Sequence, residues 1–245
     1  MRTPIVFTLF ALLLFASTAC GKDGGFSDEE AQDAAQQALL ALDDFPTGWV
    51  ERPREEDEDE NDLDFDLPPE CQAFVEQENP PGAVASAESE TFHGPGGEEV
   101  ESSVNVFADT GAAEDSVQQL KEFVTDCGEP FETALLDVFS DAFEQELDEE
   151  SGEVLSVDDL AVSVNFDRLS FPAFGDDSVA LRMSISVEFF FEEFNFFLDL
   201  VGLRVGNMTG GFSFESTDEP PDPAAEEELL GIIADKVAEA NSELN

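Results

Sequence analysis

Basic residues are scarce in this chain of 245 residues. Only 9 lysines and arginines stand against 59 aspartates and glutamates, so the formal net charge at pH 7 is −50. Phosphate binding depends on clustered basic side chains, and the composition therefore argues against nucleic acid as a partner. Because basic patches also hold proteins on anionic lipid head groups, electrostatic docking on a membrane surface is equally disfavoured.

Residues that commonly carry catalysis are rare as well. The chain has no tyrosine, one histidine (His93) and three cysteines. We find no nucleophile elbow, no phosphate-binding loop and no paired-histidine zinc motif. With one histidine, which we expect in a surface turn, and so few thiols, a usual zinc site cannot be assembled. The sequence therefore predicts a protein without catalytic activity, metal or cofactor.

The apolar segment at the amino terminus is too short to span a membrane. Residues 5–15 carry no charge, Arg2 precedes them, and small residues lead into Cys20. A membrane-spanning helix needs about 20 apolar residues, so this pattern is typical of a secretory signal peptide. The stretch before Cys20 resembles a bacterial lipobox, in which cleavage exposes a cysteine that carries a diacyl, palmitate-type anchor. Ser17 departs from that pattern, because leucine is usual at its position.

The cysteine count distinguishes lipoprotein processing from ordinary cleavage after Ala19. An odd number of cysteines in an exported protein leaves one thiol unexplained. If Cys20 carries lipid, Cys71 and Cys127 remain as a pair, and disulfides persist outside the cytoplasm. We therefore predict a lipid anchor on Cys20, a disulfide between the other two cysteines, and a location on the extracytoplasmic side of the cell membrane.

The predicted organisation has three parts. A signal peptide over 1–19 and a tether over 20–26 precede one domain over 27–245, in which 51–69 form an acidic loop. An apolar fraction of 42% is sufficient for a core in a domain of this size.

The acidic loop has two interpretations. It is either a solvated segment or a weak, diffuse site for divalent cations. Asp57, Asp59 and Asn61 begin like an EF-hand loop, but Asp62 replaces the required glycine and Pro68 replaces the bidentate glutamate. The sequence therefore does not predict an EF-hand.

Residue spacing predicts both helices and antiparallel strands. Residues 27–30 form a capping box that opens a helix expected to run to about Leu42. Residues 178–191 alternate between apolar and polar side chains, as in a strand with one buried face, and Asp222-Pro223 opens a final helix. Between these segments the signals indicate hairpins. We expect an α+β fold with an antiparallel sheet of about five to six strands and helices packed on one face.

Three residues are candidates for binding a ligand. Trp49, the only tryptophan, either anchors the core beside the first helix or stacks on a ligand. Arg182 and Arg204 lie on predicted strands, and they either pair with neighbouring acids or hold an anionic ligand group. Phenylalanines are concentrated over 189–197, which indicates either a sheet covered on both sides or the lining of an apolar cavity.

The order of several motifs resembles a known family. These motifs are Leu39-Leu40-x-Leu42-x-Asp44-x-Pro46-x-Gly48-Trp49, Val104-x-Val106-Phe107, a helix ending in Cys127, Gly175-Asp176-Asp177-Ser178-x-Ala180-x-Arg182, and Arg204-Val205-Gly206-Asn207. Over about 27–243 the chain resembles the extracellular sensor-like domains of actinobacterial lipoproteins and of PknH-type receptor kinases. The resemblance implies an α+β fold, a cleft for an unidentified ligand and no catalysis. It also implies that Cys71 and Cys127 form the first of the family's two disulfides, while the second pair is missing here.

These features together predict a lipid-anchored extracytoplasmic protein that binds a ligand or acts as a sensor. The expected partners are the membrane, reached through the lipid, and an unknown small molecule or envelope protein. An envelope carrier of an apolar ligand or lipid is the alternative, and an envelope hydrolase is a third. A cavity behind the phenylalanine-rich strands would favour the carrier, whereas two carboxylates at catalytic distance in a cleft would favour the hydrolase.

The lipid anchor can be tested by mass spectrometry. We expect the intact mass of membrane-extracted protein to fit a chain that begins at Cys20 and carries acyl chains. A Cys20→Ala variant should leave the membrane fraction, because stable attachment requires two acyl chains or an equivalent second signal. An unmodified amino terminus on the membrane-extracted protein would contradict the assigned location.

Overall fold

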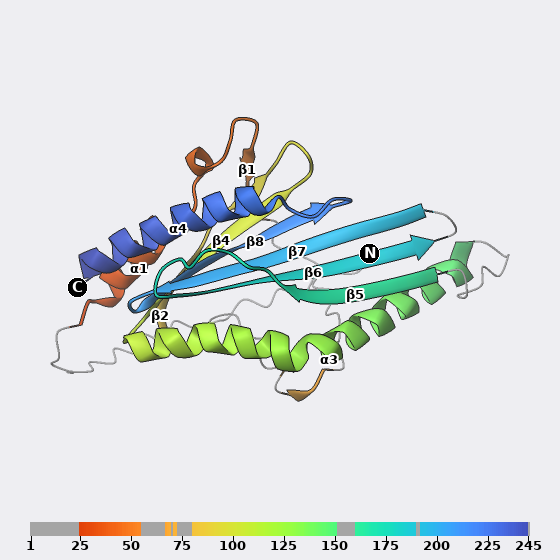
Figure 1. Cartoon of the computed structure of the whole chain (residues 1–245), viewed down its shortest axis with the longest axis horizontal. Helices are drawn as coiled ribbons and strands as arrows, with labels where there is room; N and C mark the ends of the chain where they lie inside the picture. Colours follow the sequence, from red (N-terminus) through yellow and green to blue (C-terminus); the bar gives the residue numbers. More distant parts are fainter. Residues whose placement is uncertain are drawn as a thin grey trace, which may run out of the picture.

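The computed structural model describes residues 25–54, 67–69, 71–72, 80–150, 160–189 and 192–244. Within them, an antiparallel sheet of eight strands has helices on both faces (Figure 1). The strand order is β1-β3-β4-β8-β7-β6-β5, and β2 pairs with β4 on the same edge as β3.

The strands are β1 (Val50–Arg52), β2 (Ala83–Glu88), β3 (Thr91–His93), β4 (Glu99–Phe107), β5 (Leu160–Arg168), β6 (Asp177–Phe189), β7 (Glu192–Val205) and β8 (Met208–Thr217). The helices are α1 (Asp28–Gln37), α3 (Thr110–Glu150) and α4 (Pro223–Leu244), and η1 (Leu42–Asp44) is a single 3-10 turn.

Helices α1 and α4 cover one face of the sheet, which we call the α4 face (Figure 1). Its core is built from small residues on α1 and larger apolar side chains elsewhere. Examples are Ala31 and Ala35 of α1, Val104 and Val106 of β4, Leu203 of β7, Phe212 of β8, and Ile233 and Val237 of α4. A Cβ atom added to Gly210 would lie 2.6 Å from Val237, so this glycine allows α4 to lie close to the strands.

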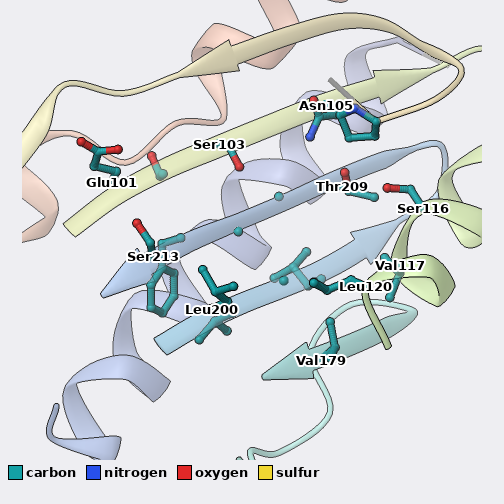
Figure 2. Close-up of a pocket in the computed structure, with 18 of the residues that line it drawn as sticks. Glu101, Ser103, Asn105, Ser116, Val117, Leu120, Val179, Leu200, Thr209 and Ser213 are labelled. Carbon is teal, nitrogen blue, oxygen red and sulfur yellow. The ribbon is translucent and has the colours of Figure 1, made fainter. Parts of the chain in front are cut away.

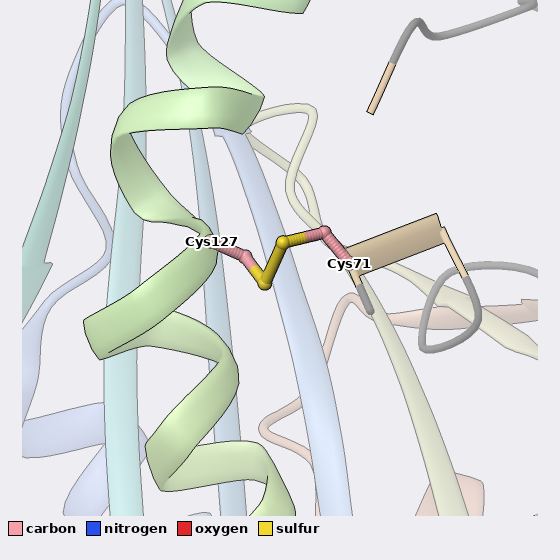
Figure 3. The surroundings of a disulfide bond; sticks show 2 residues. All are labelled: Cys71 and Cys127. Carbon is pink, nitrogen blue, oxygen red and sulfur yellow. A yellow bond between two sulfur atoms is a disulfide. The ribbon is translucent and has the colours of Figure 1, made fainter. Parts of the chain in front are cut away.

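Helix α3 covers the opposite face, which we call the α3 face. Leu135 of α3 packs with Val164 and Ile185 of β5 and β6 in a separate apolar cluster. Farther toward its amino terminus, α3 is joined to the segment around residue 71 by the disulfide between Cys71 and Cys127 (Figure 3). Among the described residues, no helix is long and apolar enough to cross a membrane.

The structure confirms the α+β class, the antiparallel sheet and the disulfide. The sheet has eight strands rather than five or six, and helices lie on both faces rather than one. The composition of β7 gives the physical reason for the second layer. Val201 and Leu203 point to the α4 face while Leu198 and Leu200 point to the α3 face, so both sides of this strand need cover.

The first helix is shorter than expected. Its capping box is present, with the Glu30 amide donating to Ser27 Oγ, but the helix ends at Gln37 instead of about Leu42. The backbone amide of Leu40 donates to Ser102 Oγ of β4 at 3.0 Å, and this contact with the sheet takes the place of a helical hydrogen bond.

Removing the disulfide should destabilise the domain. Because the two cysteines are 56 residues apart, loss of the bond should lower the free energy of unfolding by about 4 kcal/mol. The measurement is the urea midpoint of the wild type, with and without reductant, and of a Cys71→Ala/Cys127→Ala variant. Reductant should shift the wild type toward the variant and leave the variant unchanged. Free thiols at both positions in the oxidised native protein would contradict the bond.

Candidate functional site

A groove lies on the α3 face, where the first turns of α3 meet β4, β8 and β7 (Figure 2). We call it the sheet groove, and its volume is about 470 Å³. Its floor includes Ser103 and Asn105 of β4, Thr209, Gly211 and Ser213 of β8, and Leu200 and Gly202 of β7; its wall includes Ser116, Val117 and Leu120 of α3.

Two facing glycines hollow the floor of the groove. Gly202 and Gly211 are direct partners across β7 and β8. A Cβ atom on Gly202 would point toward Leu120, 3.6 Å away, and would enter the groove. A Cβ atom on Gly211 would lie 2.4 Å from the carbonyl oxygen of Val201, so a side chain there would push the two strands apart.

The groove has a polar side and an apolar side. Figure 2 shows the hydroxyl and amide groups of Ser103, Asn105 and Thr209 along β4 and β8. Leu120 and Val179 lie on the other side, next to α3 and β6. A ligand with hydrogen-bonding groups on one side and apolar surface on the other would match both sides.

The groove carries little net charge for a protein of this composition. Among the described residues, Glu88 and Glu101 are the only acids that line it, and both form ion pairs with Arg54 at one end. The Arg54 side chain is 47% exposed, so these pairs add little to stability. Arg54 offsets part of the charge of the two acids at that end, and the described side chains at the centre of the groove are uncharged.

The two arginines proposed from the sequence form ion pairs outside the groove. Arg182 donates from Nε and Nη2 to the two oxygens of Asp199, at 2.7 and 2.5 Å, beneath α4. Arg204 donates to Asp176 at 3.2 Å and to the carbonyl oxygen of Gly206. These contacts fit the pairing interpretation, and a ligand role for either arginine stays a prediction.

Trp49 lies partly exposed on the α4 face. Its ring lies 4.7 Å from that of Phe45 and 6.2 Å from that of Phe214, measured between centroids. The same side chain lines a second cavity of about 640 Å³. Trp49 therefore packs against aromatic residues of the core and also borders the second cavity.

The phenylalanine-rich segment is only partly described. Phe190 and Phe191, like Cys20 and most of the acidic loop, lie outside the described residues. Phe194 is 56% exposed. Phe196 packs against the cluster formed by α3, β5 and β6.

The sequence interpretation missed the groove itself. Its signal was present, because Gly202 and the Gly210-Gly211 pair stand inside strand-forming stretches. Glycine in a strand interior marks close approach of another backbone or a ligand. Which glycines face each other depends on the register of β7 against β8, and the spacing of residues along the chain does not reveal that register.

A buried cluster of charges beneath α4 was also missed. Glu226 of α4 is fully buried, as is Asp199, and its Oε2 lies 3.6 Å from Arg182 Nη2. Burial, together with the nearby carboxylates of Asp199 and Asp222, raises the pKa of Glu226 to about 9. Glu226 is therefore protonated at neutral pH, and the cluster holds one positive and one negative charge.

Replacing Glu226 with glutamine should remove a cost in folding free energy that grows as the pH rises. In the unfolded chain this carboxyl titrates near 4.5, so between about pH 4.5 and 9 folding takes up a proton at Glu226. Its contribution to stability therefore falls as the pH rises. From pH 6 to pH 8 the wild type should lose stability relative to Glu226→Gln, by up to about 1.4 kcal/mol per pH unit.

Urea midpoints at both pH values measure this difference. The exposed neighbour supplies the matched control, since Glu227→Gln changes the formal charge in the same way at the surface. It should show the wild-type dependence. Equal destabilisation of Glu226→Gln at both pH values would instead indicate an ionised Glu226 paired with Arg182.

Comparison with known proteins gives a distant similarity. No protein-family model matches the chain, and no curated protein matches it. Among solved structures, the chain is similar to the crystal structure of the extracellular domain of PknH from Mycobacterium tuberculosis, with 12% sequence identity and a TM-score of 0.41. The alignment covers 85% of this chain and 97% of that one. A likeness this distant does not show membership of that family and assigns no function.

Proposed function

We propose that this chain is a lipid-anchored, extracytoplasmic ligand-binding protein of the sensor type, and that its ligand occupies the sheet groove. The ligand is an uncharged small molecule with apolar surface on one side and hydrogen-bonding groups on the other. The observation that carries the proposal is the neutral, two-sided lining of the groove. The chain has 59 acidic residues, but among the described residues only two acids line the groove, and both are paired with Arg54.

The size and lining of the groove suit a small molecule. Its volume of about 470 Å³ is within the usual range for small-molecule sites. Burying about 100 Å² of apolar ligand surface against Leu120, Val179 and Leu200 would contribute about 2.5 kcal/mol. Hydroxyl and amide groups on the opposite side would orient the ligand rather than supply most of the affinity.

The wall of the groove is held in place before a ligand arrives. Leu120 lies two helical turns, about 10 Å, from Cys127 on α3. Cys127 is bonded to Cys71, and nearby Lys121 of α3 pairs with Asp177 of β6 while Arg168 of β5 donates to Thr125 of α3, so α3 is tied to the sheet beside the groove. A preformed site loses less affinity to ordering on binding.

The side chains of the groove support binding rather than catalysis. Its two carboxylates are engaged by Arg54, and the single histidine, His93, pairs with Glu99 at 3.3 Å and does not line the groove. The described residues contain no group of three or more histidine, cysteine, aspartate or glutamate side chains able to hold a metal ion. Among the described residues of the groove, no side chain is therefore placed to activate water or a nucleophile.

The carrier alternative has less support. This alternative requires a cavity behind the phenylalanine-rich strands. The described side chains at that place, Phe131, Phe166 and Phe196, pack against the cluster that contains Leu135, and the rings of Phe131 and Phe166 meet edge-on. Among the described residues, Leu135 of α3 packs against β5 and β6 at this place.

The groove can be tested with a neutral fluorescent probe. N-phenyl-1-naphthylamine, an uncharged molecule whose emission rises in apolar surroundings, should bind the wild type saturably. Ser103 is exposed on the groove floor, so Ser103→Phe should obstruct the groove and weaken binding about tenfold, equivalent to about 1.4 kcal/mol.

The matched control is Ser163→Phe. Ser163 is an equally exposed serine on β5, on the opposite face and away from the groove. It should bind the probe like the wild type, and both variants should keep the wild-type melting temperature. Equal binding by all three proteins, or no saturable binding by the wild type, would refute the assignment of the groove. Lipid co-purifying with the membrane-extracted protein would favour the carrier.

A further inference from the structure

The second cavity lies on the opposite side of the sheet from the groove. It is enclosed by the segment from η1 to β1, the end of β8 and the first turns of α4. We call it the Trp49 cavity, and its volume is about 640 Å³. It shares no lining residue with the sheet groove.

One wall of the Trp49 cavity is aromatic. Phe45 is buried against Trp49 at 4.7 Å, and the ring of Phe214 meets Trp49 edge-on at 6.2 Å and 86°. Trp49 keeps part of its surface exposed toward the cavity. The face of an indole ring attracts cations within about 6 Å and does so better than any other aromatic side chain.

Carboxylates line the rest of the cavity. Asp44 is paired with Lys236, Glu98 accepts a hydrogen bond from the Gly96 amide, and Asp222 accepts one from the Ala224 amide at the start of α4. Three further acids, Asp218, Glu219 and Glu228, also line the cavity. Within the described part of the chain, none of these three side chains forms an ion pair or hydrogen bond.

An inorganic cation does not fit this arrangement. Divalent ions such as calcium need several oxygen ligands converging on one point. The described residues contain no such group of acidic side chains, here or elsewhere. A larger cation that spreads its charge and presents apolar surface can instead contact the aromatic wall while remaining near dispersed carboxylates.

We propose that the Trp49 cavity binds an organic cation, an alkylammonium group attached to a compact apolar body. The indole face of Trp49 contacts the cationic head, and Asp218, Glu219 and Glu228 compensate its charge. The site is independent of the sheet groove, which lies on the other face and shares no lining residue with it.

The test uses the chain's single tryptophan as a reporter. Choline should change the emission of Trp49 saturably at constant ionic strength. Its uncharged isostere, 3,3-dimethylbutan-1-ol, should produce no comparable change, because it lacks the charge. Magnesium chloride alone, at matched ionic strength, should also leave the emission unchanged.

Charge-removing variants separate local contacts from the overall field. The triple variant Asp218→Asn/Glu219→Gln/Glu228→Gln keeps side-chain size, and asparagine tolerates the positive φ of 69° at position 218. It should weaken choline binding about tenfold or more. The control Glu114→Gln/Asp126→Asn/Glu129→Gln removes the same charge from exposed positions on α3 and should change the affinity less than about twofold.

Two further readouts complete the test. Trp49→Leu, followed by calorimetry instead of fluorescence, should also lose binding about tenfold. The proposal is overturned if the isostere or magnesium reproduces the choline signal. It is also overturned if the α3 control weakens binding as much as the cavity variant, or if choline does not bind saturably.

Discussion

The close pairing of β7 with β8 through glycine determines how the layers of this protein are spaced. Gly202, Gly210 and Gly211 occupy adjacent positions in the two strands. On one face, Gly210 has no side chain, so Val237 of α4 can lie where a Cβ atom at position 210 would clash with it. On the other face, the two remaining glycines leave the floor of the groove bare. A tight helix contact and an open site are thus consequences of one short stretch of sequence.

The distribution of charge follows from the cost of burying it. With 59 acids and 9 basic residues, few carboxylates can find a cationic partner. Asp199 is fully buried and accepts hydrogen bonds from Nε and Nη2 of Arg182, whereas Glu226 beside it carries a proton. Glu215 of β8 is half-buried beside Glu99 and Glu101, and burial together with these carboxylates raises its pKa. The apolar clusters on both faces therefore form without uncompensated charge inside them.

Local features of the sequence predicted local features of the fold. The capping box at Ser27, the start of the last helix at Pro223 and the pairing of Cys71 with Cys127 were all accessible, because each depends on short spacing or on cysteine count. The arrangement of helices over the two faces of the sheet was not accessible from such local features. Val104 lies opposite Gly210, and such pairs, separated by about a hundred residues, decide which side chains share a face. For Trp49 the two interpretations turned out to be compatible, since packing on Phe45 leaves part of the indole exposed.

The carboxylates around the Trp49 cavity belong to a chain whose formal net charge at pH 7 is −50. A chain with this charge gathers a counter-ion atmosphere, so the concentration of small cations beside it exceeds that of the surrounding solution. A cationic molecule therefore reaches this cavity from an enriched layer, while an uncharged molecule reaches the sheet groove at its bulk concentration. In dilute saline the enrichment extends over tens of ångströms, and at physiological ionic strength it shrinks to about 8 Å. Occupancy on the two sides of one sheet would then respond differently to the salinity of the surroundings.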